Sequence, residues 1–160
     1  INRPPNEFPN EEFPMSTKEL QEELVTEMRR WQKIEDKAVS VTASLIANTT
    51  NPLLRLILEI IHRDSMMHYR VQALIADSFT RFPVTLDVEE LTEVWDAIEK
   101  HLAIEKKMVS NTQQMLEKIK GKKMLIPEYL LNYLLEDEKK HDNLLESLEQ
   151  VKAGMYPYSG

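Results

Sequence analysis

Six glutamate and histidine residues carry the clearest metal-binding chemistry in this sequence. Glu138 and His141 form a Glu-x-x-His pair, and side chains three residues apart lie on one face of a helix. Carboxylate oxygens and imidazole nitrogens together suit iron, manganese and zinc. One such pair is common on charged helices, so its weight depends on further ligands elsewhere in the chain. The candidate metal ligands are Glu35, His68, His101, Glu105, Glu138 and His141.

An internal repeat places most of these residues at matching positions in two halves of the chain. Residues 35–42 align with residues 105–112, so that Glu35 matches Glu105. Residues 64–68 align with residues 137–141, so that His68 matches His141. A helical protein held together by packing alone has no need to repeat buried polar residues in register. The repeat therefore favours a shared binding site.

Four long helices are predicted to position these residues. Prolines separate the amphipathic segments, Ser16 stands where a helix N-cap is needed, and Gly121 stands where the third helix should end. The predicted helices cover residues 17–48, 52–77, 88–120 and 127–153, with a connection over residues 79–87.

Each predicted helix carries a seam of residues at alternating steps of three and four, which is the spacing of a four-helix bundle. The seam of the first helix is Leu24, Met28, Trp31, Glu35, Ala38, Thr42 and Leu45. All four seams are apolar at both ends and polar in the middle third, where the six candidate ligands lie. An unpaired carboxylate in a bundle core costs several kcal/mol. We therefore interpret the polar layer as a binding site.

The composition agrees with an all-α protein and argues against several functions. The 160 residues suit one domain, and three glycines disfavour turn-rich β folds and phosphate-binding loops. The net charge of −7 argues against a nucleic-acid partner. The lack of cysteine excludes disulfides, thiolate metal sites and a rubredoxin-type iron centre. No apolar run approaches the ~20 residues that span a bilayer and no signal-peptide pattern opens the sequence, so we expect no membrane partner and a cytoplasmic location.

The predicted domain organisation follows the prolines and glycines. Four prolines within residues 1–14 indicate an extended or disordered arm, which we place at residues 1–16. Residues 17–153 are expected to form the four-helix bundle, and residues 154–160 a short tail.

At these residues the sequence resembles the ferritin-like, rubrerythrin-like superfamily of di-iron carboxylate proteins, over about residues 20–152. The resemblance implies a ferritin-like bundle of two repeated helical hairpins. It also implies that Glu35 and His68 hold one metal, Glu105 and His141 the other, and the glutamates of the Glu-x-x-His motifs bridge them. Two departures stand out: Ser65 occupies the position of the first bridging glutamate, and His101 faces the seam one turn before Glu105. The preferred version is an asymmetric centre, in which His101 offsets the missing carboxylate.

The resemblance implies iron-dependent redox chemistry with dioxygen or peroxide, with manganese or zinc as other metals that the ligands accept. An external electron donor and a homodimer are the expected partners. The alternative is a non-catalytic helical bundle in which Glu–His hydrogen bonds satisfy a degenerate, metal-free site. The sequence leaves open whether the protein is an enzyme.

Several other residues attract attention and are interpreted as structural. Glu59 and His62 also have Glu-x-x-His spacing but lie off the seam. The methionines Met66, Met67 and Met108 are expected to pack in the core or at an interface rather than to bind metal. Asp64 lies beside Ser65 but about 100° round the helix, which favours a supporting or surface role over that of a ligand.

The connection between the second and third helices is a geometric difficulty for this interpretation. The symmetry of the family requires these helices to run parallel, and therefore requires a long crossover. If both helices end early, residues 78–91 are free and reach about 46 Å when fully extended. We expect an extended segment through residues 82–84, or a domain-swapped dimer that relaxes the constraint.

Overall fold

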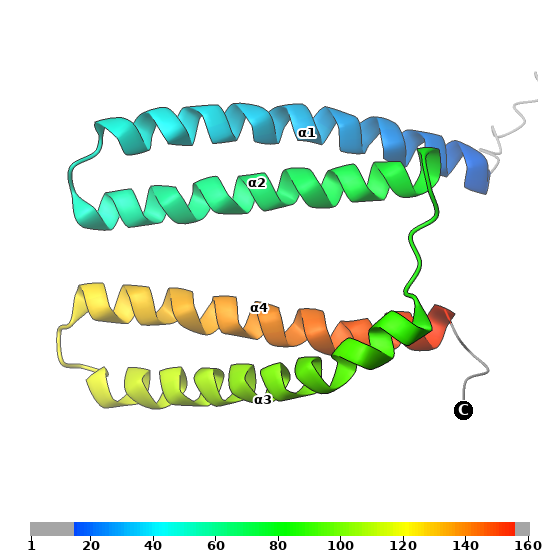
Figure 1. The fold of residues 1–160 in the computed structure, drawn as a ribbon. Coiled ribbons are helices and arrows are strands. Elements are labelled where there is room, and N and C mark those ends of the chain that lie inside the picture. The colour runs from blue at the N-terminus through cyan, green and yellow to red at the C-terminus, as the bar shows by residue number, and fades with distance from the viewer. Residues whose placement is uncertain (1–14, 156–160) are drawn as a thin grey trace, which may run out of the picture. The chain divides into compact units, whose positions relative to one another are not determined.

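The computed structural model describes residues 15–155, apart from the side chains of residues 149, 152 and 155. The described chain is all-α, with four long helices (Figure 1). Residues 1–14 of the predicted N-terminal arm and residues 156–160 of the predicted tail lie outside the described residues, so these parts stay predictions, whereas residues 154 and 155 belong to the last helix rather than to a tail. The helices are α1 (Thr17–Asn48), α2 (Pro52–Thr80), α3 (Val88–Ile119) and α4 (Leu125–Met155).

Local capping explains where the helices begin. The Ser16 hydroxyl accepts a hydrogen bond from the Glu19 backbone N–H at 3.3 Å, and the Glu19 carboxylate accepts one from the Ser16 backbone N–H at 2.9 Å, which completes a capping box. Asn51 caps α2 directly before Pro52, whose missing N–H costs nothing in the first turn. Gly121, at φ 72°, lies directly after the end of α3 as predicted.

The helices pack as two hairpins, α1 against α2 and α3 against α4. The first compact unit ends at Val84 and the second begins at Thr85. The boundary falls inside the predicted connection, and it separates the two copies of the sequence repeat. Each copy of the repeat therefore forms one hairpin.

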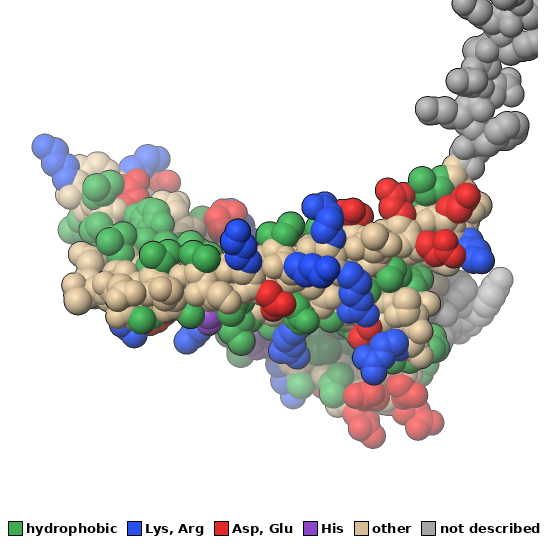
Figure 2. All heavy atoms as spheres, turned by 90° about the horizontal axis from the view of Figure 1, so that it is seen from above, with side chains coloured by type: hydrophobic (Ala, Val, Ile, Leu, Met, Phe, Trp, Pro, Cys, Tyr) green, Lys and Arg blue, Asp and Glu red, His purple; other side chains and the backbone are tan. Residues whose placement is uncertain are grey.

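The predicted seams of α1 and α3 each divide into a buried and an exposed stripe within their own hairpin. On α1, Met28 and Thr42 are buried and Glu35 is half-buried, whereas Trp31 and Leu45 are exposed. The second hairpin repeats this alternation, with Glu105 and Thr112 buried and Val94, Met108 and Met115 exposed. Two helices bury only the stripe that lies between them, so each hairpin keeps an open apolar stripe. Figure 2 shows hydrophobic side chains open at the surface among charged ones.

The connection between α2 and α3 is shorter than the sequence suggested, because neither helix ends early. Only Arg81–Asp87 lies between them, and residues 82–87 form neither helix nor strand. Seven extended residues reach about 25 Å, whereas the 29 residues of α2 make a helix of about 44 Å. A crossover along the whole length of a helix therefore needs more chain than these seven residues supply. The estimate of 14 free residues was wrong.

None of the helices in the described part of the chain is both long and apolar enough to cross a membrane.

Candidate metal centre

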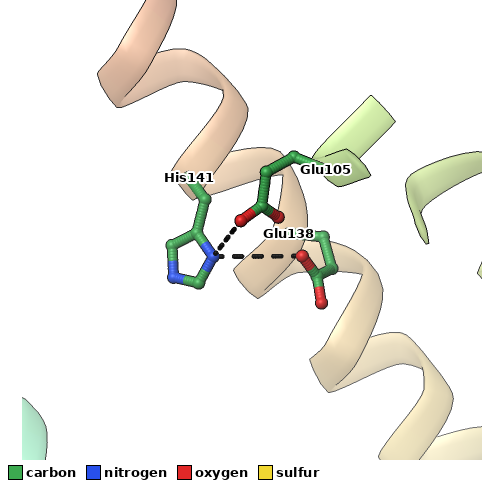
Figure 3. Close-up of side chains that lie close together, drawn as sticks. All are labelled: Glu105, Glu138 and His141. Atoms are coloured by element: carbon green, nitrogen blue, oxygen red, sulfur yellow. Dashed lines mark ion pairs between the residues drawn. The ribbon is translucent and has the colours of Figure 1, made fainter. Parts of the chain in front are cut away.

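Three of the six candidate ligands meet inside the second hairpin. Glu105 comes from the middle of α3, and Glu138 and His141 come from the middle of α4 (Figure 3). One ligand atom from each side chain lies within 4.8 Å of the others. Among the described residues, no other group of three or more His, Asp or Glu side chains meets this closely. The group could therefore hold a metal ion.

His141 lies between the carboxylates of this cluster, and its two ring nitrogens face different ones. Nδ1 lies 3.5 Å from Glu105 Oε1 and 3.9 Å from Glu138 Oε2. Nε2 lies 3.7 Å from Oδ2 of Asp137, whose other oxygen pairs with Lys140. Histidines that bind metals commonly direct the second ring nitrogen to a carboxylate, which fixes the tautomer and the orientation of the ring. Asp137 occupies that position here, in agreement with a supporting role.

Glu105 is the buried centre of the cluster, at 5% exposure. Its Oε1 atom is 2.7 Å from Nε2 of His101, the fourth candidate of this hairpin. Its Oε2 atom is buried and has no hydrogen-bond partner among the described residues. A carboxylate oxygen held away from water without a donor is costly, so this atom marks the place where a cation or a proton would be most stabilising.

The two carboxylates of the cluster perturb each other. A protonated Glu138 can donate a hydrogen bond to Glu105, and this bond, together with burial and the negative charge of Glu105, raises the pKa of Glu138. The same hydrogen bond, assisted by the charges of His141 and His101, lowers the pKa of Glu105. At a pH between the lowered pKa of Glu105 and the raised pKa of Glu138, the two carboxylates share one proton. A divalent cation would replace that proton and would neutralise both charges.

His101 contacts Glu105 as the sequence suggested, but its side chain is 59% exposed. It lies on the open stripe of α3, one turn before Glu105, and is therefore accessible to solvent in the hairpin described by itself. Its Nε2 atom is within hydrogen-bond distance of Glu105 Oε1, at 2.7 Å. Whether it binds the ion directly stays a prediction.

The candidates of the first hairpin form a different cluster. His68 Nδ1 lies 3.4 Å from Glu35 Oε1, so this pair also meets across its hairpin. Ser65 is buried at 6% exposure in the position that Glu138 has in the repeat. Gln72 donates a hydrogen bond from Nε2 to Glu35 Oε1 at 3.5 Å. No third metal-binding side chain joins Glu35 and His68 among the described residues.

Gln72 is the contact that the sequence interpretation missed. It lies on α2 seven residues after Ser65, and therefore on the same face of the helix, but it is not one of the six candidate ligands. The signal available was its place in the repeat, where it matches Leu145. A polar residue at a position that is apolar in the other copy indicates a buried polar partner.

The residues interpreted as structural have varied environments. The Thr42 hydroxyl and His62 Nδ1 are 2.8 Å apart, which gives His62 a hydrogen-bonding role inside the first hairpin. Met66, Met67 and Met108 are exposed, so the prediction that they pack in the core is wrong for their own hairpins. Their use at an interface stays a prediction.

Comparison with known proteins yields no match: no family model fits the sequence, and no curated protein and no solved structure is detectably similar to it. The ferritin-like resemblance therefore rests on the motif positions alone.

Proposed function

We propose that this protein binds a divalent metal ion through Glu105, Glu138 and His141, and that the ion is iron. The observation that supports the proposal most directly is the buried Oε2 of Glu105, which lacks a donor beside a second carboxylate and an imidazole nitrogen. Two oxygen ligands and one nitrogen ligand suit iron, manganese and zinc. The preference for iron comes from the motif resemblance to rubrerythrin-like proteins.

In this proposal each side chain has a distinct task. Glu105 and Glu138 supply oxygen ligands and charge, and His141 supplies Nδ1. Asp137 lies 3.7 Å from the Nε2 atom of His141, on the side of the ring away from the site, and the Nε2 atom of His101 faces Glu105 Oε1 at 2.7 Å. Bound iron would supply redox chemistry toward dioxygen or peroxide. Because the sequence contains no cysteine with which to build an iron–sulfur centre, the electrons would come from an external donor.

We propose further that the open apolar stripes of the hairpins become covered in a ferritin-like four-helix bundle. The support is the alternation of buried and exposed seam residues within each hairpin, because a bundle buries both stripes of every helix. The short Arg81–Asp87 segment disfavours the long crossover of the family. Two arrangements would then cover the stripes. Either the two hairpins of one chain pack together with a short connection between them, or two chains exchange hairpins in a homodimer. Light scattering distinguishes a particle of 18.7 kDa from one of twice that mass.

A second candidate function is a non-catalytic helical protein whose polar cluster is satisfied without metal. The 2.7 Å contact between His101 and Glu105 favours it, because the imidazole Nε2 already gives Glu105 Oε1 a partner within the protein. Protonation of Glu138 would satisfy the other oxygen of Glu105.

Elemental analysis of protein purified without chelators decides between the two candidates, followed by addition of iron(II) and peroxide with absorbance detection. The informative variant is Glu138→Ala, and the matched control is Glu136→Ala, which removes a 73% exposed glutamate from the same helix. We expect the wild type and the control to retain metal and Glu138→Ala to lose it. Metal binding that is unaffected by Glu138→Ala would refute the proposed site. Bound iron that leaves peroxide unchanged would refute the redox activity alone.

A further inference from the structure

The two hairpins differ in how they satisfy the repeat-matched glutamates, Glu35 in the first hairpin and Glu105 in the second. The register of the sequence repeat is supported by Thr42 and Thr112. These two residues match each other, both are buried, and each lies one heptad after its glutamate, Glu35 or Glu105. The positions around the two glutamates can therefore be compared one by one. They differ at three places that contact or flank the carboxylate. One is Trp31, which matches His101, whose Nε2 is 2.7 Å from Glu105 Oε1; the other two are described below.

In the first hairpin, Glu35 is satisfied by hydrogen-bond donors of the protein itself. Gln72 Nε2 and His68 Nδ1 approach the same Oε1 atom, at 3.5 and 3.4 Å. The amide is turned so that its NH₂ group faces Glu35, although this leaves its own Oε1 buried and without a partner. No carboxylate oxygen of Glu35 is left buried and unpaired. Ser65 adds no second negative charge.

In the second hairpin the corresponding donor is missing and a charge is added. Leu145 stands at the position of Gln72 and cannot donate a hydrogen bond, and Glu138 stands at the position of Ser65. The outcome is a buried Glu105 oxygen without a donor next to a second carboxylate. A cation in this hairpin would give Glu105 Oε2 the partner that it lacks, whereas Glu35 in the first hairpin already accepts a hydrogen bond from the Gln72 amide and faces no second carboxylate at position 65.

We propose that the chain binds one divalent metal ion, in the second hairpin alone, and that the first hairpin is a metal-free counterpart in which Gln72 and Ser65 replace the cation and the second carboxylate. This inference rests on the proposed metal-binding function. It departs from the two-metal centre that the motif resemblance implies, because Glu35 and His68 then serve as hydrogen-bonding residues rather than ligands.

The first test compares the two repeat-matched glutamates, with Mn²⁺ as the probe. Native mass spectrometry and calorimetric titration of the wild type should give one Mn²⁺ per chain. Glu105→Gln should weaken Mn²⁺ binding about 100-fold or more, whereas Glu35→Gln should change the affinity less than about threefold. Two ions in the wild type, or loss of the ion in Glu35→Gln, would overturn the inference and leave the proposed function standing. No ion in the wild type would instead refute the proposed function.

The second test exchanges the distinguishing residues between the hairpins. Ser65→Glu combined with Gln72→Leu should create a second site, and the stoichiometry should rise from one to two. Glu138→Ser combined with Leu145→Gln should abolish Mn²⁺ binding and retain the helical circular dichroism of the wild type. A folded first double variant that still binds one ion would contradict the roles given to Ser65 and Gln72. If that variant does not fold, the comparison of Glu35→Gln with Glu105→Gln decides the matter.

Discussion

Replacing Glu138 by glutamine should abolish metal binding and at the same time stabilise the metal-free protein. The amide of glutamine is uncharged and nearly isosteric, and it can donate the hydrogen bond that Glu105 Oε2 lacks. The raised pKa of Glu138 has a defined consequence for stability. A carboxyl group whose pKa is higher in the folded state favours folding below its unfolded pKa, and this contribution is lost as the pH rises through the folded value. The charge of Glu138 therefore weakens the metal-free fold near neutral pH.

The size of the effect follows from the contact with Glu105. A hydrogen bond to a charged group contributes about 1.5–3 kcal/mol when buried, and the 20% exposure of Glu138 favours the lower end. For a chain of this length, 1 kcal/mol shifts the Tm by about 2–4 °C. Glu138→Gln should thus raise the Tm of metal-free protein by about 3–6 °C at pH 7–8. Metal at 100 times its Kd stabilises the wild type by about 2.7 kcal/mol, or about 5–11 °C, and should leave the variant unchanged.

Thermal melts followed by circular dichroism measure both effects, with chelator or with Mn²⁺, between pH 5 and pH 8. The difference in Tm between the metal-free variant and the metal-free wild type should grow as the pH rises, since only the wild type ionises at position 138. The lowered pKa of Glu105 acts in the opposite direction, favouring folding above its unfolded pKa, and it is lost only as the pH falls through the lower folded value. A metal-free variant that melts below the wild type at pH 8, or that still gains stability from Mn²⁺, would refute this reasoning.

Three further outcomes test separate contacts. Asp137→Asn should weaken Mn²⁺ binding about 10–100-fold in calorimetry, because the ring of His141 loses the carboxylate beside Nε2. The control is Asp64→Asn at the exposed matching position of the repeat, which should leave Mn²⁺ binding unchanged. Thr42→Val should lower the free energy of unfolding by about 1 kcal/mol in urea titrations through loss of the bond to His62 and leave Mn²⁺ affinity unchanged; a change in affinity would refute the separation of the two clusters. Ser16→Ala removes the capping box and should cost about 1 kcal/mol of stability, and an unchanged urea midpoint would show that the first turn of α1 contributes nothing.

The helices were predictable because their boundaries are set by local chemistry. Ser16 and Pro52 determine where α1 and α2 begin, and both effects act within one helical turn. The end of α2 was predicted three residues too early, because the sequence around Phe79 carries bulky and β-branched residues. The helix continues to Thr80, where hydroxyl groups bond to backbone carbonyls, and stops before Pro83 restricts the preceding residue.

The candidate site was predictable in part, for a reason of periodicity. The spacing of Glu138 and His141 places both on one face of α4, and the repeat identified Glu105 as their partner. The seam does not reveal which of its two stripes faces the neighbouring helix and which stays open. For that reason the exposure of His101 could not be derived from the sequence, and the repeat could indicate a polar partner for Gln72 but not that this partner is Glu35. Both depend on how the two helices of a hairpin are rotated about their axes.

The bond between Gln72 and Glu35 also has a consequence for the order in which the chain matures. The first hairpin leaves the ribosome before the second and satisfies its half-buried carboxylate with a hydrogen bond from its own amide, so its formation needs no ion from the medium. In the second hairpin Glu105 keeps a buried oxygen without a partner among the described residues, and on the proposed function an ion would supply that partner. If the proposal holds, a chain made in metal-depleted cells would have a complete first hairpin and a less stable second one, whose helices would be the first target for proteolysis.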